Sequence, residues 1–108
     1  MAYQVVWSPK ALDDVEAIAV YISRDSASYA AAVVKKILDV TRSLDHCPTS
    51  GEIVPEFDDD SVRQQFAYMY RIIYRIKDDK VTVATVTYKK KLLEEFGEGY
   101  YISSKALN

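Results

Sequence analysis

Two alternating runs of residues constrain this fold more than any other feature of the chain. The runs "YRIIYRI" (70–76) and "VTVATVTY" (81–88) are rich in β-branched and aromatic residues, and only the polar link "KDDK" separates them. A link this short joins antiparallel neighbours, whereas parallel strands need a long crossover. The sequence therefore predicts an antiparallel hairpin that pairs 70–76 with 81–88.

The first of these strands has two chemically different faces, because successive side chains of a strand point to opposite sides. One face is aromatic and aliphatic, and the other carries the charges. The members are Tyr70, Ile72, Tyr74 and Ile76 against Arg71, Ile73 and Arg75. If the apolar face packs on helices, we expect both arginines to be displayed together on the exposed face of the sheet.

Two helices are predicted upstream, at 9–23 and 27–44. Ser8 and Pro9 suit the N-cap and first position of a helix, and each segment carries an apolar stripe at helical spacing. The short break "SRDS" predicts an antiparallel helical hairpin. We expect one core in which the helices face the sheet, made of Leu12, Val15, Ile22, Val33, Ile37 and Leu44 against Tyr70, Ile72 and Tyr74.

The remaining segments complete an α+β fold of order β-α-α-β-β-β. "YQVVW" (3–7) and "SVRQQFAY" (61–68) are strand-like, and the segment before 61 has the composition of a loop. We expect a four-stranded, antiparallel-type sheet packed against the helical hairpin. Residues 1–108 are predicted to form a single domain with a core of about 3–91, followed by a tail or short helix that starts in "KKKLLEEF" (89–96).

Composition excludes several classes of protein. The chain of 108 residues is 49% hydrophobic, which is enough to form a core, and it has no apolar run long enough for a membrane span. With no signal peptide and the single Cys47, we expect a cytoplasmic protein with no membrane partner. Residues 1–60 hold 5 Lys/Arg and 11 Asp/Glu, while 61–108 hold 9 and 5, so positive charge collects in the second half. That asymmetry fits an anionic target or plain solubility.

No metal or cofactor site is expected. His46 and Cys47 are adjacent but have no second ligand pair at a metal spacing. The run Asp58–Asp60 lies in a loop, where three acids usually form a solvated turn. We therefore predict a protein without cofactors.

Four segments in this order and spacing resemble the RelE/ParE superfamily of type II toxins, the toxic halves of bacterial toxin–antitoxin pairs. They are "WSPKALDDVEAIAVYI" (7–22), "GEIVPEF" (51–57), "VRQQF" (62–66) and "YRIIYRIKDDKVTVATV" (70–86). The Trp-Ser start, the "PEF" loop and the strand "YRIIYR" resemble the ParE branch more closely. The resemblance spans about residues 3–91.

The resemblance implies a toxin that a cognate antitoxin neutralises and that contacts operator DNA only through the antitoxin. ParE-like members inhibit DNA gyrase by binding it, which is the leading interpretation. RelE-like members cleave mRNA on the ribosome, which is the alternative. A degenerate interaction module is the third.

For the cleaving branch, the resemblance implies roles for Arg71 and Lys91, with Tyr100 or Tyr101 as weak substitutes for a catalytic tyrosine. The lysines of that branch are replaced by Val62 and Gln64. No catalytic residue is assigned for the gyrase interpretation. The predicted target-binding set is Arg63, Arg71, Arg75, Lys89, Lys90 and Lys91.

The strand arginines also fit a merely solvated sheet face or ion pairs with acids. If instead they contact the target, we expect Arg71→Ala to lower activity and leave the fold intact.

Overall fold

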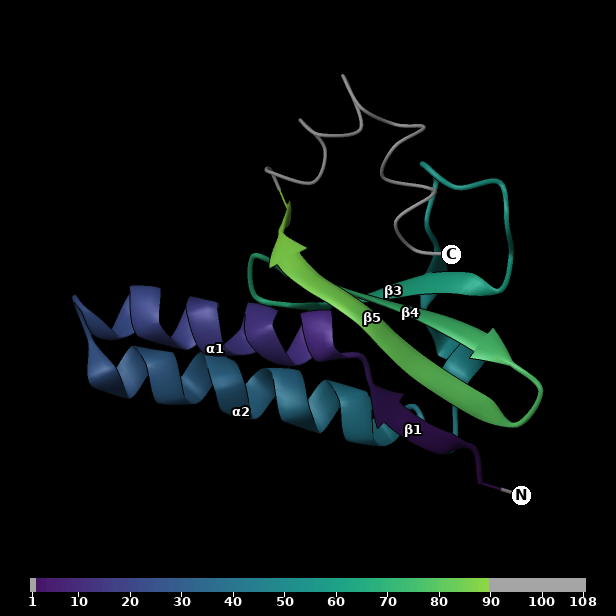
Figure 1. The fold of residues 1–108 in the computed structure, drawn as a ribbon, viewed down its shortest axis with the longest axis horizontal. Coiled ribbons are helices and arrows are strands. Elements are labelled where there is room, and N and C mark those ends of the chain that lie inside the picture. Colours follow the sequence, from purple (N-terminus) through teal and green to yellow (C-terminus); the bar gives the residue numbers. More distant parts are fainter. Residues whose placement is uncertain (1, 90–108) are drawn as a thin grey trace.

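The computed structural model describes residues 2–89 of the 108. The α+β order is confirmed, with one strand more than expected (Figure 1). The predicted helix at 89–96 lies outside the described residues except for its first position. In chain order the elements are β1 (Gln4–Trp7), α1 (Pro9–Ser23), α2 (Ala27–Ser43), a 3₁₀ turn η1 (Pro48–Ser50), β2 (Glu52–Ile53), β3 (Val62–Ala67), β4 (Tyr70–Lys77) and β5 (Lys80–Tyr88).

The sheet has five strands in the order β1-β5-β4-β3-β2. β4 runs antiparallel to both β3 and β5, so the predicted hairpin is confirmed. The sheet is mostly antiparallel, as expected, but it has five strands instead of four, and β1 runs parallel to β5, with Val5 opposite Val81. A parallel pair needs a long crossover, and residues 8–79 provide it here.

The two helices form the predicted antiparallel hairpin against one face of the sheet (Figure 1). Ser8 caps α1 by accepting a hydrogen bond from the amide of Ala11 at 3.0 Å. Ser26 does the same for α2 with the amide of Tyr29 at 3.1 Å. Both hydroxyls satisfy backbone donors that have no partner inside the helix, which explains where each helix begins.

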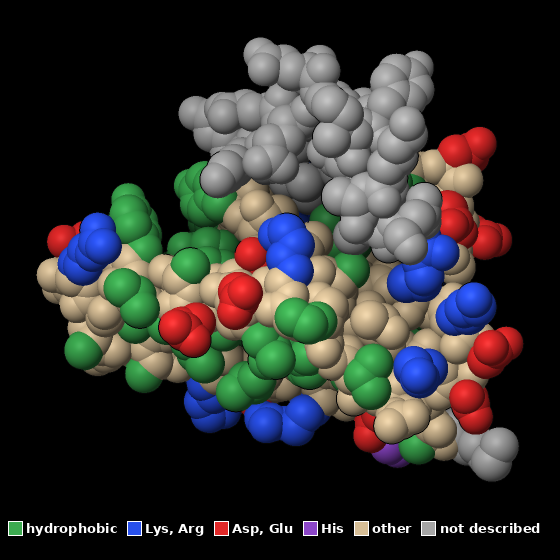
Figure 2. Space-filling model, viewed as in Figure 1, with side chains coloured by type: hydrophobic (Ala, Val, Ile, Leu, Met, Phe, Trp, Pro, Cys, Tyr) green, Lys and Arg blue, Asp and Glu red, His purple; other side chains and the backbone are tan. Residues whose placement is uncertain are grey.

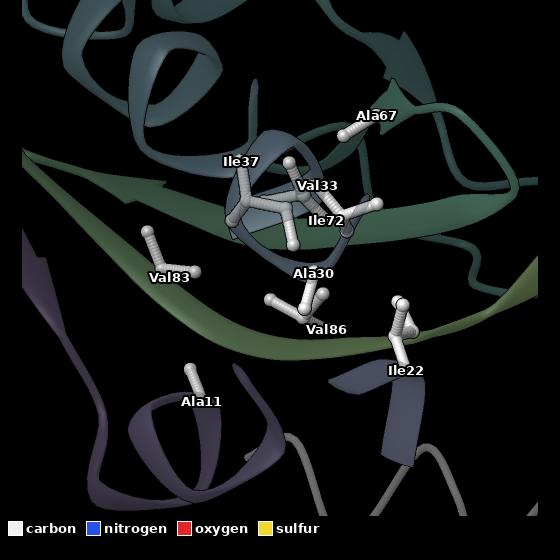
Figure 3. Packing of buried hydrophobic residues seen from close by; sticks show 9 residues of the cluster. All are labelled: Ala11, Ile22, Ala30, Val33, Ile37, Ala67, Ile72, Val83 and Val86. Atoms are coloured by element: carbon white, nitrogen blue, oxygen red, sulfur yellow. The ribbon is translucent and has the colours of Figure 1, made fainter. Parts of the chain in front are cut away.

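The main core lies between the helices and the central strands. Figure 3 shows Ile37 and Val33 of α2 against Ile72 of β4, with Val83 and Val86 of β5 beside them. Leu44 and Tyr74 are also buried, in a neighbouring cluster with Val81. The predicted facing of helices and strand is therefore confirmed for most of the expected residues.

Leu12 is the exception, because 57% of its surface is exposed. On α1 the buried residues are Ala11 and Ile22, with Val15 and Ile18 partly buried against the same core, so Ala11 takes the place expected of Leu12. Ala11 is fully buried, and its small side chain allows α1 to approach β5 closely. The hydroxyl of Ser8 fixes that approach by donating to the carbonyl of Ala84 at 2.8 Å.

β5 contains a one-residue bulge where it meets α1. Ile73 lies opposite Thr85 but Tyr74 lies opposite Val83, which leaves Ala84 without a partner on β4. The amide of Val86 donates to the Asp14 carboxylate at 3.0 Å. Side chains of α1 and its cap therefore bind the edge of β5 just beyond the end of β1.

The second face of β4 is also covered, contrary to expectation. Val54 and Phe57, from the loop after β2, pack with Val62 and Ile73 in a second apolar cluster. Arg71 lies on this face and is only 2% exposed. The prediction that the arginines are displayed together on an open face is wrong for Arg71, because the loop containing Val54 and Phe57 lies over that face.

The start of this covering segment is held at Gly51. The hydroxyl of Tyr74 donates to the carbonyl of Pro48 at 2.6 Å. A Cβ atom on Gly51 would lie 2.2 Å from that hydroxyl and 2.6 Å from the carbonyl of Gln64. Only glycine fits this close approach without displacing its neighbours.

Neither helix among residues 2–89 is long and apolar enough to cross a membrane.

Truncation of the buried stripe of α2 should destabilise the protein strongly. We expect Ile37→Ala to lower the free energy of unfolding by about 2–5 kcal/mol, because it removes methyl groups from a fully buried site. Leu12→Ala removes an exposed side chain and is the matched control, with an expected change within about 0.5 kcal/mol. Chemical denaturation measures both, and equal losses would show that the buried face is misassigned.

Candidate functional site

Arg71 is held by a carboxylate and an amide on the loop-covered face of the sheet. Its Nη1 donates to Glu56 Oε2 at 2.9 Å and its Nη2 to Glu56 Oε1 at 3.0 Å, so the ion pair is bidentate. Its Nε donates to Gln64 Oε1 at 2.8 Å, and Nη2 also contacts that oxygen. Bidentate geometry and charge make this the strongest type of hydrogen-bonded side-chain pair.

Three elements position these groups. Arg71 is near the start of β4, opposite Phe66 of β3, and Gln64 lies two residues earlier on the same face of β3. Glu56 comes from the loop, between the buried residues Val54 and Phe57. The apolar neighbours of Glu56 therefore anchor the loop while the ion pair fixes its polar centre.

The pair is charged in the folded protein. Burial acts to raise the pKa of Glu56, but the hydrogen bonds from Arg71, a backbone hydrogen bond and the attraction of the guanidinium outweigh it, and the pKa lies below its usual value. Four contacts engage the guanidinium, which has five N–H donors. Arg71 thus has little capacity left to bind an external anion.

The other predicted arginines do not join Arg71 in one basic surface. The side chain of Arg75 is 32% exposed and lies 3.7 Å from Asp59. Arg63 lies opposite Tyr74 and so belongs to the other face, where it donates to the carbonyls of Asp60, Thr49 and Gly51. Both side chains tie the segment 49–60 to the sheet.

Lys89 is an exposed cation on the face of Arg71. Its Nζ lies 5.1 Å from the ring centre of Phe66, a cation–π contact. Figure 2 shows acidic and basic side chains interspersed over the part of the sheet in view, instead of one basic surface. The remaining predicted residues, Lys90, Lys91, Tyr100 and Tyr101, lie outside the described residues.

Sequence reasoning missed Glu56 and Phe66. Glu56 lies in the "PEF" segment. Its neighbours Val54 and Phe57 are apolar residues within an otherwise polar loop, a pattern that indicates a buried loop. A carboxylate that such a loop holds against the sheet requires a cation beside it, and β4 supplies Arg71 and Arg75.

A second candidate surface is an apolar groove on the outer side of the helical hairpin, with a volume of about 540 Å³. Alanines of both helices leave the space open, and we call it the helix groove. Val20 and Leu38 line it and are 51% and 38% exposed. Lys35 and Arg42 also line it, and both contact Asp39.

The chemistry of the described residues is limited. Among residues 2–89 no group of three or more His, Cys, Asp or Glu side chains could hold a metal ion. RNA cleavage would require a base for the 2′-hydroxyl and an acid for the leaving oxygen. Glu56 is ionised but engaged by Arg71, and His46 contacts Asp45 in the turn after α2 at 2.5 Å. Among the described residues, no contact places a second side chain next to Glu56 that could act as the general acid.

Comparison with known proteins gives a consistent result. The family model described as "ParE toxin of type II toxin-antitoxin system, parDE" matches residues 5–93. No match is found among curated proteins.

Several solved structures share the fold at low sequence identity. The chromosomal ParDE system from P. aeruginosa has a TM-score of 0.66 and 19% identity, over 81% of this chain and 96% of that chain. A mutant of the E. coli toxin RelE in the free state has a TM-score of 0.61 and 18% identity, over 94% and 98%. The YoeB dimer from Staphylococcus aureus has a TM-score of 0.59 and 18% identity, over 82% and 98%. At these identities the likeness concerns the fold alone.

Arg71→Ala should destabilise the fold, which reverses the expectation from the sequence. The change leaves the largely buried carboxylate of Glu56 without its cation, and breaking a buried ion pair lowers the free energy of unfolding by about 3–5 kcal/mol. The double variant Glu56→Leu with Arg71→Met removes both charges and should be less destabilised than Arg71→Ala alone. Urea denaturation of the three proteins measures this.

The same pair predicts a pH dependence. The pKa of Glu56 is lower in the folded than in the unfolded protein, so its stabilisation is complete above about pH 4.5, its ordinary value, and is lost as the pH falls through the folded value. The stability difference between wild type and Glu56→Gln should therefore shrink below that pH. A difference that is independent of pH from 7 to 3 would contradict the ion pair.

Proposed function

We propose, on the premise that this chain belongs to the ParE toxins of type II toxin–antitoxin systems, that it stops growth by binding DNA gyrase and not by cutting RNA. The gyrase target comes from the resemblance to the ParE branch, and the choice of binding over cleavage comes from the site.

One observation carries this proposal: the buried ion pair of Glu56 and Arg71. A cleaving enzyme needs a cation that is free to stabilise a developing phosphate charge and an acid–base pair in reach of the substrate. Here the sheet arginine is engaged by Glu56 and Gln64 through four of its contacts and is 2% exposed. These contacts favour a structural role for Arg71 and a toxin that acts through its surface.

The alternative is ribosome-dependent mRNA cleavage. It would use the ionised Glu56 beside Arg71 as the base, once the loop over the sheet had moved. Such a movement would uncover the cluster of Val54, Phe57, Val62 and Ile73, which is unfavourable. Binding to gyrase requires no such movement, and we therefore favour it.

A side-by-side assay of the purified protein separates the two. We expect inhibition of gyrase supercoiling and no cleavage of ribosome-bound mRNA. The triple variant Lys89→Ala, Lys90→Ala and Lys91→Ala should lose about tenfold or more in gyrase affinity with unchanged thermal melting, since Lys89 is an exposed cation beside Phe66 on this face.

A matched control removes three exposed lysines away from Lys89: Lys36 on α2, and Lys77 and Lys80 at the opposite end of the β4–β5 hairpin. It tests whether total charge alone matters, and it should inhibit gyrase like wild type. If the wild-type protein cleaves ribosome-bound mRNA and Arg71→Lys abolishes that cleavage, the result would contradict the proposal and support the alternative. Equal losses in both triple variants would remove Lys89–Lys91 from the target-binding set.

The cognate antitoxin is the expected partner of a toxin in this family, and we place it on the helix groove. The groove is apolar and Lys35 and Arg42 line it, so it fits an amphipathic helix with acidic flanks. Solved structures that share this fold include toxin–antitoxin complexes, among them the YoeB–YefM complex from Staphylococcus aureus. This placement is independent of the gyrase question.

Co-expression with the neighbouring open reading frame tests the groove. We expect co-elution of the two proteins, loss of co-elution in Val20→Glu and Leu38→Glu, and no effect of Leu12→Glu. A glutamate in an apolar contact should weaken binding by tenfold or more, because its charge is desolvated without a partner. Separate elution of the wild-type protein, with no effect of either protein on growth, would contradict the toxin–antitoxin pairing.

A further inference from the structure

The edge of β5 is open where β1 ends. β1 pairs with β5 only from Lys80 to Val83, and within residues 2–89 no other strand pairs with that edge further along. Val86 directs its amide to this side, where Asp14 accepts it. The amide of Lys89 points the other way, to the carbonyl of Met69 at 2.9 Å. Because alternate residues of a strand direct their N–H and C=O groups to the same edge, those of Tyr88 face the open side.

An aromatic hollow lies beside this open edge. Its volume is about 680 Å³, and its walls include Tyr21 of α1, Tyr70 of β4 and Tyr88 of β5. Tyr21 is 68% and Tyr88 is 42% exposed, while the rings of Tyr70 and Tyr88 meet edge to face at 5.8 Å. Figure 2 shows hydrophobic side chains gathered above the C-terminal half of α1. We call this hollow the tyrosine pocket.

Two more tyrosines extend the aromatic surface. Tyr29 of α2 and Tyr68 of the β3–β4 turn have ring centres 6.1 Å apart, and both are about half exposed. Burial raises the pKa of Tyr70, and the hydroxyls of Tyr29, Tyr88 and Tyr21 raise it further. Exposed aromatic surface of this extent is typical of interaction sites.

Tyr68 has a backbone conformation that is unusual for a tyrosine. Its φ is 55°, in the left-handed region where glycine or asparagine is the usual residue. A large aromatic side chain at such a position is unfavourable, and Met69 beside it is 51% exposed. The turn thus presents two apolar side chains to solvent at the end of the aromatic surface.

Acidic side chains outnumber basic ones on α1 around the tyrosine pocket, which favours a cationic occupant. Asp14 lines the pocket and binds Lys10 at 3.0 Å. Asp13 and Glu16 line an adjoining hollow with Tyr21 and Arg24. The faces of tyrosine rings also attract cations. Phosphates of a nucleic acid would meet the acids of α1, which argues against a nucleic acid here.

We propose that the tyrosine pocket and the open edge of β5 bind an extended, basic segment of a partner protein. The segment adds a strand beside Tyr88, beyond the amide of Val86 that Asp14 binds, so that its backbone bonds to the groups of Tyr88 that face the open edge. An arginine or lysine of the segment then inserts between Tyr21 and Tyr88. This mode of recognition combines affinity from backbone hydrogen bonds with specificity from a side-chain pocket. The proposal does not depend on the gyrase target or on the helix groove.

The probe is an acetylated, amidated seven-residue peptide that alternates valine with arginine, titrated into the full chain at about 0.15 M salt to screen long-range attraction. We expect binding that shifts the amide resonances of Val86 and Tyr88. Peptides with glutamine or glutamate in place of arginine should bind at least tenfold more weakly. A peptide N-methylated at alternate amides should also lose about tenfold, because it cannot pair with the edge.

Tyr21→Ala and Tyr88→Ala should each weaken the arginine peptide about tenfold. Leu12→Ala is the matched control, because Leu12 is exposed on the same helix but lies about two and a half turns before Tyr21, on the opposite side of the helix. Equal binding of the glutamate peptide, or binding that neither tyrosine variant changes, would overturn the proposal. So would tighter binding of oligothymidine at this site, or self-association of the chain that Tyr21→Ala abolishes.

Discussion

Burial of β4 on both faces is the constraint on which the rest of the structure depends. The helices cover one face through Ile72 and Tyr74, and the loop after β2 covers the other through Ile73. A strand covered on both sides cannot leave a charged side chain without a partner, because an unpaired buried charge is strongly destabilising. Arg71 lies on this strand, so the fold requires an acid beside it, and Glu56 meets that requirement.

This requirement shapes the remaining geometry of the loop. Glu56 reaches Arg71 only if the residues around it pack onto the sheet, and Val54 and Phe57 do so. At the start of the segment, Gly51 permits the close contact with Tyr74. The ion pair, the apolar anchors and the glycine therefore act on the same segment and hold it in one position.

The surfaces that remain outward-facing are suited to binding. Because Arg71 is engaged internally, the described chain presents its apolar helix groove, the tyrosine pocket and the exposed Lys89. Each of these has the size or composition of a contact site for another macromolecule. A toxin that acts on one protein and is neutralised by another needs separate surfaces of this kind, and the proposed functions assign them to different partners.

The sequence by itself determined the features that depend on neighbours in the chain. The caps at Ser8 and Ser26, the two helices, the β4–β5 hairpin and the facing of Ile72 and Tyr74 follow from local chemistry and periodicity. The tertiary structure alone decided the parallel pairing of β1, the bulge at Ala84, the exposure of Leu12 and the burial of Arg71. Alternation predicts which side of a strand a residue occupies, but exposure depends on what lies over that side. Glu56, in the loop that covers Arg71, lies 15 positions away from it in the sequence. No local sequence pattern specifies a contact over that separation.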